Sequence, residues 1–532
     1  MNTQAPHAAL NRRQFLARAG AIATAAAFSP DLWPQTLEPP LEHRLPATDV
    51  DFQRSRSYIE ETPVPAYHWA SERAVEAFTD MKFGLRIHWG IYSLFQRPGE
   101  SWPFLTLPFE QRQTYNQAYS TWNPVEFDAN SWMTLCRDSG LKMFAFTTKH
   151  HEGFSMFDTK TRVRNRVNWT AVGGPRIEDC DLSYSIMETP FRRDVVAELT
   201  AAARRHGIKI DLYFSHSDWY DADFRPYGWH PLQVPSSPEL WGWPASGRTT
   251  QEFWDSMKKR MADRVVMVPD PSPAQVKRMV ERHRTQLTEL LTRYGDIDMM
   301  CLDIFWGPSL WPQMRETILK MRSLQPDLML RARGIGNYGD YYTPEGFVPA
   351  SKESTRMPWF VIYPLGSSFS YESDPTRYKG TKWIIDNLVD ATAKGGNFMV
   401  GVGPDGKGSF HPTAVDQLRG TGKWLRINGE AIFATRPRPG TLWSEGSNLR
   451  FTRSKDHRVI YCFALDWPGR VLEIRSFEPR KIISVALLGS DRQLSHRWDP
   501  ARGLVITIPE ELQQPSNRPC DFAWGFKIVL SG

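Results

Sequence analysis

Between about residue 69 and residue 430, two hydrophobic patterns alternate along the chain. Short apolar runs typical of buried strands are followed by stretches in which apolar residues recur every three or four positions, as on one face of a helix. The runs predict strands over residues 83–90, 141–148, 208–215, 297–303, 327–333, 359–363 and 397–403. The periodic stretches predict helices over residues 72–81, 128–140, 191–206, 273–294, 310–324, 376–393 and 412–427.

Seven strands that alternate with helices predict an α/β fold with a parallel sheet. The alternation of strands and helices favours a (β/α)8-like TIM barrel in which one further strand is hidden in an irregular region. A doubly wound open sheet has a similar alternation, but the sequence lacks the glycine-rich loop typical of dinucleotide-binding folds. For the helix 191–206, Thr189 is predicted as the N-cap, Pro190 as the first helical residue and Gly207 as the terminator.

The pattern changes after about residue 430. Short apolar segments over residues 449–453, 459–464, 471–474, 483–488 and 526–530 follow one another with turns between them and no comparable helix. This pattern of short strands separated by turns predicts a small antiparallel β-sandwich. We therefore expect a barrel over residues 66–430 and a sandwich over residues 431–532.

The N-terminus has the features of an export signal. Residues 11–16, Asn-Arg-Arg-Gln-Phe-Leu, form a twin-arginine pattern, and a weakly apolar stretch over residues 19–28 follows it. That stretch is too short to span a bilayer, so no membrane span is predicted. We expect a signal peptide over residues 1–30, a linker over residues 31–65, and export by the twin-arginine route to the periplasm or beyond.

Composition excludes several classes of protein. Of the 532 residues, 41% are hydrophobic and 23% charged, which is typical of globular rather than disordered chains. The formal charge is +6, but Arg12, Arg13 and Arg18 lie in the predicted signal peptide, so the remainder is near +3 and nucleic-acid binding is not expected. The five cysteines have no CxxC or CxxH spacing, so no zinc site is predicted. The 21 Trp and 17 Tyr suit stacking on sugar rings, although they also fill large cores.

Polar residues follow the predicted barrel strands where each strand ends. They are His88, His150, His151, Ser215, His216, Asp303 and Arg333. Because the carboxyl ends of barrel strands meet at one mouth, these residues are expected to become neighbours and to form a functional site. Taken alone, Asp303 is either a functional carboxylate or the cap of the next turn.

Two chemistries fit such a mouth. In metal-assisted hydrolysis, His88, His150, His151 and Asp303 would be ligands, but adjacent histidines on a strand point to opposite sides, which disfavours this reading. In glycoside hydrolysis, Asp303 would be a fixed, ionised nucleophile kept charged by Arg333. A second carboxyl group on a loop, with a raised pKa, would act as acid and base. The candidates for it are Glu345, Glu353, Glu372 and Glu100.

Five motifs, taken together and in order, resemble the α-L-fucosidases of glycoside hydrolase family 29. They are Phe-Gly-Leu-Arg-Ile-His-Trp-Gly (83–90), Lys-His-His-Glu-Gly-Phe (149–154), Thr-Pro-Phe-Arg-Arg-Asp-Val-Val (189–196), Lys-Gly-Gly-Asn (394–397) with Val-Gly-Pro (402–404), and Asn-Gly-Glu-Ala-Ile (428–432) with Thr-Arg-Pro (435–437). The predicted C-terminal strands also resemble the β-sandwich of that family.

The resemblance implies a retaining exo-hydrolase that removes terminal α-L-fucose from glycans or oligosaccharides and needs no metal or other cofactor. By position, Asp303 would be the nucleophile, Arg333 a supporting cation, and His88, His150 and His151 ligands of the sugar hydroxyls. Glu345 matches one version of the family's acid/base, a glutamate after Thr-Pro. Glu100 and Trp102 correspond to a Glu-Trp pair that binds the sugar, here separated by Ser101. The sequence makes no prediction of the oligomeric state.

Several positions depart from the family pattern. Cys301 stands where the family often has Trp, Phe214 interrupts a Tyr-Tyr-Ser motif, and Phe360 replaces the glutamate of Pro-Trp-Glu. Changes around the sugar leave two alternatives to α-L-fucose hydrolysis. One is a related α-L-glycosidase such as an α-L-galactosidase, and the other is a fucose-binding protein without turnover.

Overall fold

The computed structural model describes residues 41–47, 59–232, 268–344, 348–349, 356–478 and 482–531. Contacts within the chain separate Met1–Leu41 from one large unit, Glu42–Gly532. The predicted signal peptide, and residues 31–40 and 48–58 of the predicted linker, lie outside the described residues. In the described ranges, no helix combines the length and the apolar character that crossing a membrane requires.

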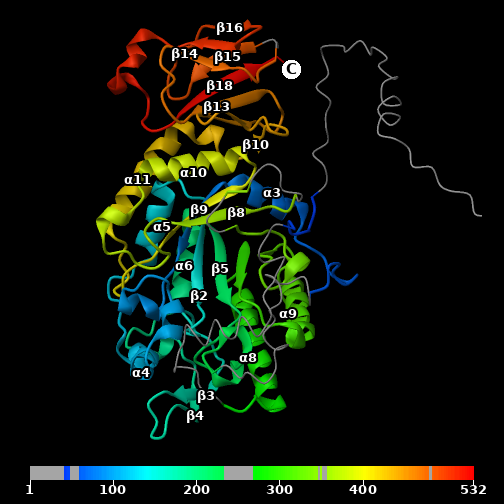
Figure 1. Cartoon of the computed structure of the whole chain (residues 1–532), viewed down its shortest axis with the longest axis vertical. Helices are drawn as coiled ribbons and strands as arrows, with labels where there is room; N and C mark the ends of the chain where they lie inside the picture. The colour runs from blue at the N-terminus through cyan, green and yellow to red at the C-terminus, as the bar shows by residue number, and fades with distance from the viewer. Residues whose placement is uncertain are drawn as a thin grey trace, which may run out of the picture. The chain divides into compact units, whose positions relative to one another are not determined.

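A parallel seven-stranded sheet forms the centre of the large unit (Figure 1). Its strands are paired in the order β7-β6-β5-β2-β1-β9-β8. They are β1 Phe83–Ile87, β2 Met143–Lys149, β5 Lys209–Ser215, β6 Met299–Asp303, β7 Met329–Leu330, β8 Phe360–Pro364 and β9 Asn397–Val402. Each predicted barrel strand is therefore present, and β7 is much shorter than its apolar run predicts.

A two-residue bridge joins the edge strands of this sheet. Tyr341 pairs in parallel with Arg331 at the end of β7, and Tyr342 pairs in parallel with Trp359 just before β8. The backbone N–H of Ala332 donates to Tyr341 at 2.8 Å. The hidden eighth strand is thus reduced to this bridge, which closes the curled sheet in the manner of a (β/α) barrel.

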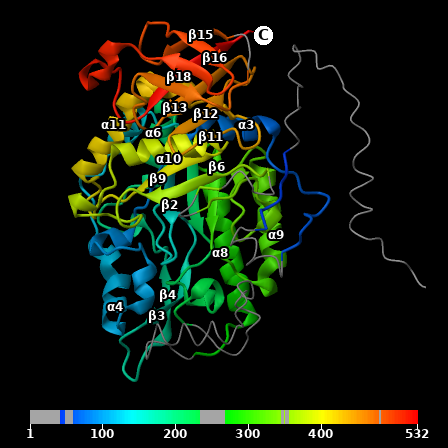
Figure 2. The ribbon, with the colours of Figure 1, turned by 45° about the horizontal axis from the view of Figure 1, so that its top comes forward.

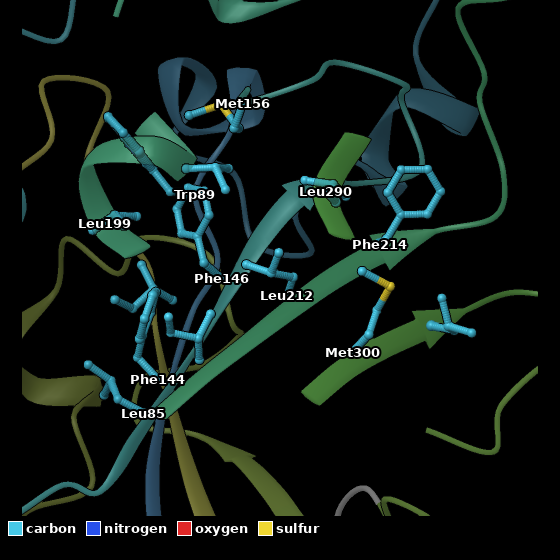
Figure 3. Close-up of a cluster of buried hydrophobic side chains, with 14 of the residues drawn as sticks. Leu85, Trp89, Phe144, Phe146, Met156, Leu199, Leu212, Phe214, Leu290 and Met300 are labelled. Atoms are coloured by element: carbon cyan, nitrogen blue, oxygen red, sulfur yellow. The ribbon is translucent and has the colours of Figure 1, made fainter. Parts of the chain in front are cut away.

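Helices cover the outside of the sheet. They are α3 Glu72–Met81, α5 Ala129–Asp138, α6 Val195–His206, α8 Pro273–Thr292, α9 Trp311–Leu324, α10 Thr381–Ala393 and α11 Pro412–Asn428. Between helices and strands, Phe144, Leu212 and Phe214 point towards Leu199 of α6 and Leu290 of α8 (Figure 3). All five are fully buried, and each such side chain stabilises the fold by roughly 1.5–3 kcal/mol.

The start of α6 corrects the predicted boundary. The helix begins at Val195, where Asp194 is the N-cap and accepts the N–H of Ala197 at 2.9 Å, and Gly207 ends it with φ of 64° as predicted. Thr189 bonds instead to Ile186 in the preceding turn. Arg192 has a φ of 49°, which a right-handed helix does not allow, so the helix cannot start before it.

Before α6, the barrel part contains a helix and a hairpin that were not predicted. The helix is α4, Phe109–Gln117, and the hairpin of β3 Val163–Asn168 and β4 Arg176–Leu182 follows β2. The long segment between β5 and α8 is described up to residue 232 and again from residue 268. Its first part contains two short 3₁₀ turns, Ala222–Phe224 and Tyr227–Trp229, which pack against the barrel. Residues 233–267 lie outside the described ranges.

The C-terminal part is an antiparallel β-sandwich, as predicted (Figure 2). One sheet has the order β10-β12-β13-β18-β15 with β11 paired to β12, and the other has the order β14-β17-β16. The strands are β10 Arg436–Pro437, β11 Ser444–Glu445, β12 Leu449–Arg453, β13 Val459–Ala464, β14 Val471–Ile474, β15 Ile482–Leu487, β16 His496–Asp499, β17 Gly503–Thr507 and β18 Trp524–Leu530. Strands β10, β11, β16 and β17 were not among the predicted ones.

The sandwich packs on the last two barrel helices. Trp424 of α11 donates its indole N–H to Ala523 at 2.7 Å, and Arg450 of β12 pairs with Asp390 of α10 at 2.7 Å. Tyr461 belongs to the same hydrophobic cluster as the barrel core. The five cysteines all lie in the described ranges, and all are free thiols.

Side chains inside the barrel form three layers, because every second residue of a strand points inwards. The lowest layer is apolar and consists of Met143, Met299, Met329 and Met399, closed by Phe78 and Met81 of α3. The middle layer contains Arg86, Asp211, Cys301 and Arg331, and the upper layer contains His88, Tyr213, Asp303 and Arg333. The interior is therefore apolar at the amino ends of the strands and polar at their carboxyl ends.

Candidate active site

The carboxylate of Asp303 lies at the centre of the polar end. Tyr213 donates its hydroxyl to Oδ2 at 2.7 Å, and Arg333 donates to Oδ1 at 3.0 Å. The backbone N–H of Ile304 also donates to Oδ1 at 3.0 Å, and Nη1 of Arg331 is 3.8 Å from the same oxygen. Both oxygens are thus held in place, while 12% of the side chain is exposed to the mouth of the barrel.

This environment keeps Asp303 ionised. Burial by itself would raise the pKa of the carboxyl group, but the charges of Arg333 and Arg331 outweigh it, with smaller contributions from His151 and the Tyr213 hydroxyl. The pKa of Asp303 is held well below 3.8 as a result. The structure thus supports the predicted pairing of Asp303 with Arg333.

The chain turns sharply after Asp303. Ile304 has a φ of 74°, which is rare for a β-branched residue and marks local strain of the kind found at functional sites. Its carbonyl oxygen would lie only 2.4 Å from a Cβ atom at position 334, which is why Gly334 is required there. The turn points the N–H of Ile304 back to the carboxylate of Asp303.

Two of the three predicted histidines contact each other beside Asp303. The rings of His150 and His151 are 4.1 Å apart, and Nε2 of His151 is 4.0 Å from Oδ2 of Asp303. The expectation that they point to opposite sides is wrong, because β2 ends at Lys149 and strand alternation does not extend to them. His150 bonds to Ser101, and His151 bonds to Ser215 at 2.6 Å.

His88 completes the wall of the site. Its ring stacks on Phe369 at 5.0 Å and meets the ring of His150 edge-on at 5.9 Å. Burial lowers the pKa of His88 and of His151 well below 6.5, so both rings are neutral at neutral pH. A neutral imidazole offers one donor and one acceptor, which suits hydrogen bonding to sugar hydroxyls. Across the described parts of the chain, no group of three or more His, Cys, Asp or Glu side chains is placed to hold a metal ion.

Trp102 and Glu100, predicted as a pair, face different surroundings. The Trp102 ring is 4.7 Å from the His151 ring and 37% exposed, and it meets Trp219 at 5.5 Å and Trp229 at 6.0 Å. Glu100 is buried and lines a cavity of about 140 Å³ whose walls include Tyr92, Phe95, Arg97 and Tyr115. Neither Asp303 nor any of the three histidines lines that cavity. The structure therefore places Trp102 against the histidine wall and Glu100 in the lining of this cavity.

The candidates for the second carboxyl group differ in what the structure describes. Glu345 and Glu353 lie outside the described residues. Glu372 accepts hydrogen bonds from Ser367 and from the N–H of Asp374. Burial would raise the pKa of Glu372, but the bond from Ser367 and its other partners lower it overall, which does not suit a general acid.

Tyr213 and Arg331 contact or approach Asp303 but are missing from the predicted site residues. Each lies two positions before a residue in the predicted polar set, Ser215 or Arg333, so the strand period of two could have found both. His216 does not join the site. Its ring bonds to His283 of α8 at 2.9 Å, and only its backbone N–H reaches β6.

A fixed, ionised carboxylate at the mouth of a (β/α) barrel, beside neutral histidines and an exposed tryptophan, is the arrangement of a glycoside hydrolase. Residues 56–430 match the family model described as alpha-L-fucosidase, and residues 444–529 match the alpha-L-fucosidase C-terminal domain. Since the first match covers more than half of the chain, the protein belongs to the alpha-L-fucosidase family, glycoside hydrolase family 29.

Known proteins agree with this assignment. The chain is 25% identical to the tissue alpha-L-fucosidase of Mus musculus over 477 residues, which covers 85% of this chain and 91% of that protein. Alpha-L-fucosidase isoenzyme 1 from Paenibacillus thiaminolyticus has a TM-score of 0.66 at 24% identity, covering 87% and 99% of the two chains. A GH29 alpha-L-fucosidase from Bacteroides thetaiotaomicron has a TM-score of 0.68 at 20% identity, covering 89% and 100%.

Proposed function

We propose that the protein is a retaining exo-α-L-fucosidase that removes terminal α-L-fucose from oligosaccharides or glycoconjugates through a covalent intermediate on Asp303. The observation behind this proposal is the state of Asp303, whose two oxygens are both held by donors and whose pKa is kept well below 3.8. A nucleophile of this class must be ionised and aimed at one carbon atom. The donors around Asp303 and its lowered pKa support this role.

In the first step, an oxygen of Asp303 attacks the anomeric carbon and the bond to the leaving oxygen breaks. In the second step, water attacks the same carbon and the carboxylate leaves, so the configuration is retained overall. A related protein lends support, since the GH29 alpha-L-fucosidase from Bacteroides thetaiotaomicron has been trapped as a covalent intermediate with 2-fluoro-fucosyl fluoride.

Glu345 is the proposed acid and base. In the sequence it comes next after Pro344, whose carbonyl accepts the N–H of Ile362 in β8 at 3.2 Å. The acid would protonate the leaving oxygen and then take a proton from the attacking water. Glu353 and Glu100 are the remaining alternatives, because Glu372 has a lowered pKa.

The histidine wall is the proposed sugar-binding surface. His88, His150 and His151 would bond to the hydroxyl groups, and Trp102 would stack on an apolar face of the substrate. An α-L-galactoside differs from an α-L-fucoside only by a hydroxyl group at C6. Comparing kcat/KM for the two aryl glycosides tests this specificity, and a preference for the galactoside would replace fucose in the proposal.

We also propose that the protein is exported by the twin-arginine route. The supporting observation is the Asn11–Leu16 motif followed by a weakly apolar stretch. Changing Arg12 and Arg13 together to Lys should stop export of a tagged chain in a bacterial host, as fractionation would show. Equal export of both forms would contradict this part of the proposal.

The decisive test of the mechanism is azide rescue. Wild type, Asp303→Ala and Glu345→Ala are assayed on an aryl α-L-fucoside with and without azide. Azide should restore turnover to Asp303→Ala with β-fucosyl azide as the product, because the azide itself attacks from the side of the missing carboxylate. It should restore turnover to Glu345→Ala with the α-azide, because the covalent intermediate still forms.

A matched control is Asp298→Ala, which removes the carboxylate that pairs with Lys209 at 2.6 Å, at the other end of the same barrel. It should leave turnover unchanged. Wild-type activity in Asp303→Ala would refute the nucleophile assignment. Fucose affinity in wild type without any product would show a binding protein rather than an enzyme.

A further inference from the structure

Two buried arginines meet at one sulfur atom directly below the nucleophile. Nη2 of Arg86, from β1, lies 2.9 Å from Sγ of Cys301, and Nη1 of Arg331 lies 3.2 Å from it. All three side chains are buried. Cys301 precedes Asp303 by two residues on β6, so both point into the barrel and Cys301 forms the layer beneath Asp303.

Both arginines are connected to the carboxylate of Asp303. Nη1 of Arg331, the same atom that contacts Cys301, is 3.8 Å from Oδ1. The guanidinium group of Arg86 lies over the ring of Tyr213 at 5.4 Å from its centre, and the hydroxyl of that tyrosine donates to Oδ2 at 2.7 Å. The layer thus reaches one oxygen of the nucleophile directly and the other through Tyr213.

The layer also contains one acidic side chain, Asp211 of β5, which is fully buried. Burial raises the pKa of Asp211 to about 6 although Arg86 and Arg331 oppose the rise. The other titratable groups that act on Asp211 or are acted on by it are Asp298, Cys301 and Tyr341. The described side chains of this layer thus bring two guanidinium groups and one carboxyl group beneath Asp303.

Burying charged groups is costly even when they are paired, so buried guanidinium groups inside a barrel core are weak evidence for a stabilising role. Their position beneath Asp303 points to a role in catalysis. When the bond between the sugar and the enzyme breaks, the electron pair of that bond moves to the Asp303 oxygen, and negative charge develops 3.8 Å from Nη1 of Arg331. Cations fixed in advance around a developing charge lower the barrier of such a step.

We propose that Arg86, Cys301 and Arg331 form a positioning layer for the nucleophile, in which the sulfur of Cys301 holds the two guanidinium groups in place beneath Asp303. The layer promotes the second step of the proposed reaction. There, water adds to the anomeric carbon, its proton passes to the acid/base residue, and the carboxylate of Asp303 leaves with the electron pair. This inference rests on the proposed function.

Position 301 then requires a side chain that accepts hydrogen bonds, and the size of the side chain alone is not enough. A sulfur atom accepts N–H donors from two directions, as a hydroxyl oxygen does, whereas a methyl group of similar volume accepts none and so removes this acceptor from both buried guanidinium groups. Cys462 of β13 offers a matched comparison. It is equally buried, but it packs in the apolar core of the sandwich with Phe451 and Phe526.

The test compares Cys301→Ser and Cys301→Val with Cys462→Ser and Cys462→Val. The expected order of thermal unfolding temperatures is reversed between the two sites, with Ser above Val at position 301 and Val above Ser at position 462. This readout needs no substrate. The same order at both positions would overturn the inference, because Cys301 would then be an ordinary core residue.

Kinetics test the positioning role. Cys301→Ser should keep kcat within about 3-fold of wild type, whereas Cys301→Val should lower kcat at least tenfold and move the acidic limb of kcat/KM to higher pH. A burst of aryl alcohol before the steady state should grow in Cys301→Val, because the second step is the one that slows. Unchanged kcat and pH profile in a folded Cys301→Val protein would overturn the inference.

Arg331→Lys gives a second variant in case Cys301→Val does not fold. It keeps the charge but loses the planar fork that spans sulfur and carboxylate, so kcat should fall tenfold or more while KM stays within about 2-fold. An unchanged kcat in Arg331→Lys would count against the proposal. Absence of fucoside hydrolysis by wild type would instead refute the proposed function, and the unfolding order at positions 301 and 462 separates that failure from a failure of the layer itself.

Discussion

The inward face of β6 joins two regions with opposite properties. Met299, at the amino end, lies in an apolar cluster with Met143, Met329 and Met399 of the sheet and with Phe78 and Met81 of α3. Asp303, two inward positions further on, lies among arginine, tyrosine and histidine side chains. Three residues therefore separate an apolar layer that stabilises the fold from the layer that contains the candidate nucleophile. Substitutions at the two ends should separate stability from activity.

The largest effect is expected at the carboxyl end. Asp303→Asn keeps the shape of the side chain but removes the nucleophile and its charge, so kcat on an aryl α-L-fucoside should fall by about 10⁴-fold or more. Circular dichroism should show a folded protein. A fall of less than tenfold would mean that the polar end of the barrel is not the catalytic one.

At the amino end, the expected loss is in stability. Met299→Ala leaves a cavity in a packed apolar layer and should lower the free energy of unfolding by about 2–5 kcal/mol. The kcat/KM of the folded enzyme should stay within about 3-fold of wild type. Denaturant unfolding and the same fucoside assay check both parts. A large loss of activity in stably folded protein would break the comparison between the two ends.

The free energy of unfolding should depend on pH because of Asp211 in the middle layer of the barrel interior. The pKa of Asp211 is about 6 in the folded protein and near 3.8 when unfolded, so the folded state binds the proton more tightly. This contribution is present in full below pH 3.8 and is lost as the pH rises through about 6. Relative to Asp211→Asn, wild type should lose about 3 kcal/mol of unfolding free energy over that range. Denaturant titrations of both proteins at several pH values measure it, and a difference independent of pH would contradict the raised pKa.

A smaller effect is expected from the cation beside the nucleophile. Arg333→Gln removes a charge that holds the pKa of Asp303 down, so that pKa should rise and the acidic limb of kcat/KM should move to higher pH. At the optimum, kcat/KM should fall by about 10²-fold, as for the loss of one preorganised donor. Arg73→Gln, at an exposed ion pair with Asp327, is the control and should leave the pH profile unchanged.

The amino-acid sequence predicted the order of helices and strands well, because apolar residues recur with a different period in helices and in strands. Helix α3 and strands β12, β13 and β14 have the predicted bounds. The start of α6 was wrong because Thr189 and Asp194 are both acceptable N-caps in sequence. Contacts outside the helix select Asp194, whose carboxylate also accepts the hydroxyl of Tyr294 at 2.8 Å and the N–H of Asp158 at 3.1 Å.

The closing bridge could not be predicted for a similar reason. Tyr341 and Tyr342 make too short a run to show a period, and they pair only because the two edge strands stand on either side of them. The β3–β4 hairpin also lacks a strong apolar signal, since it has one partly exposed strand and one with no fully buried residue.

For the site, the sequence by itself determined which residue types arrive at the strand ends, since strand alternation and barrel topology bring His88, Asp303 and Arg333 to one mouth. Only the tertiary structure decided their partners. The approach of His151 to Asp303, the hydrogen bond from Tyr213 to Asp303, and the contacts of Arg86 and Arg331 with Cys301 all join different segments. Local patterns fix which way a side chain points along its own strand, whereas distances across the barrel depend on how the strands curl together, and no single segment contains that information.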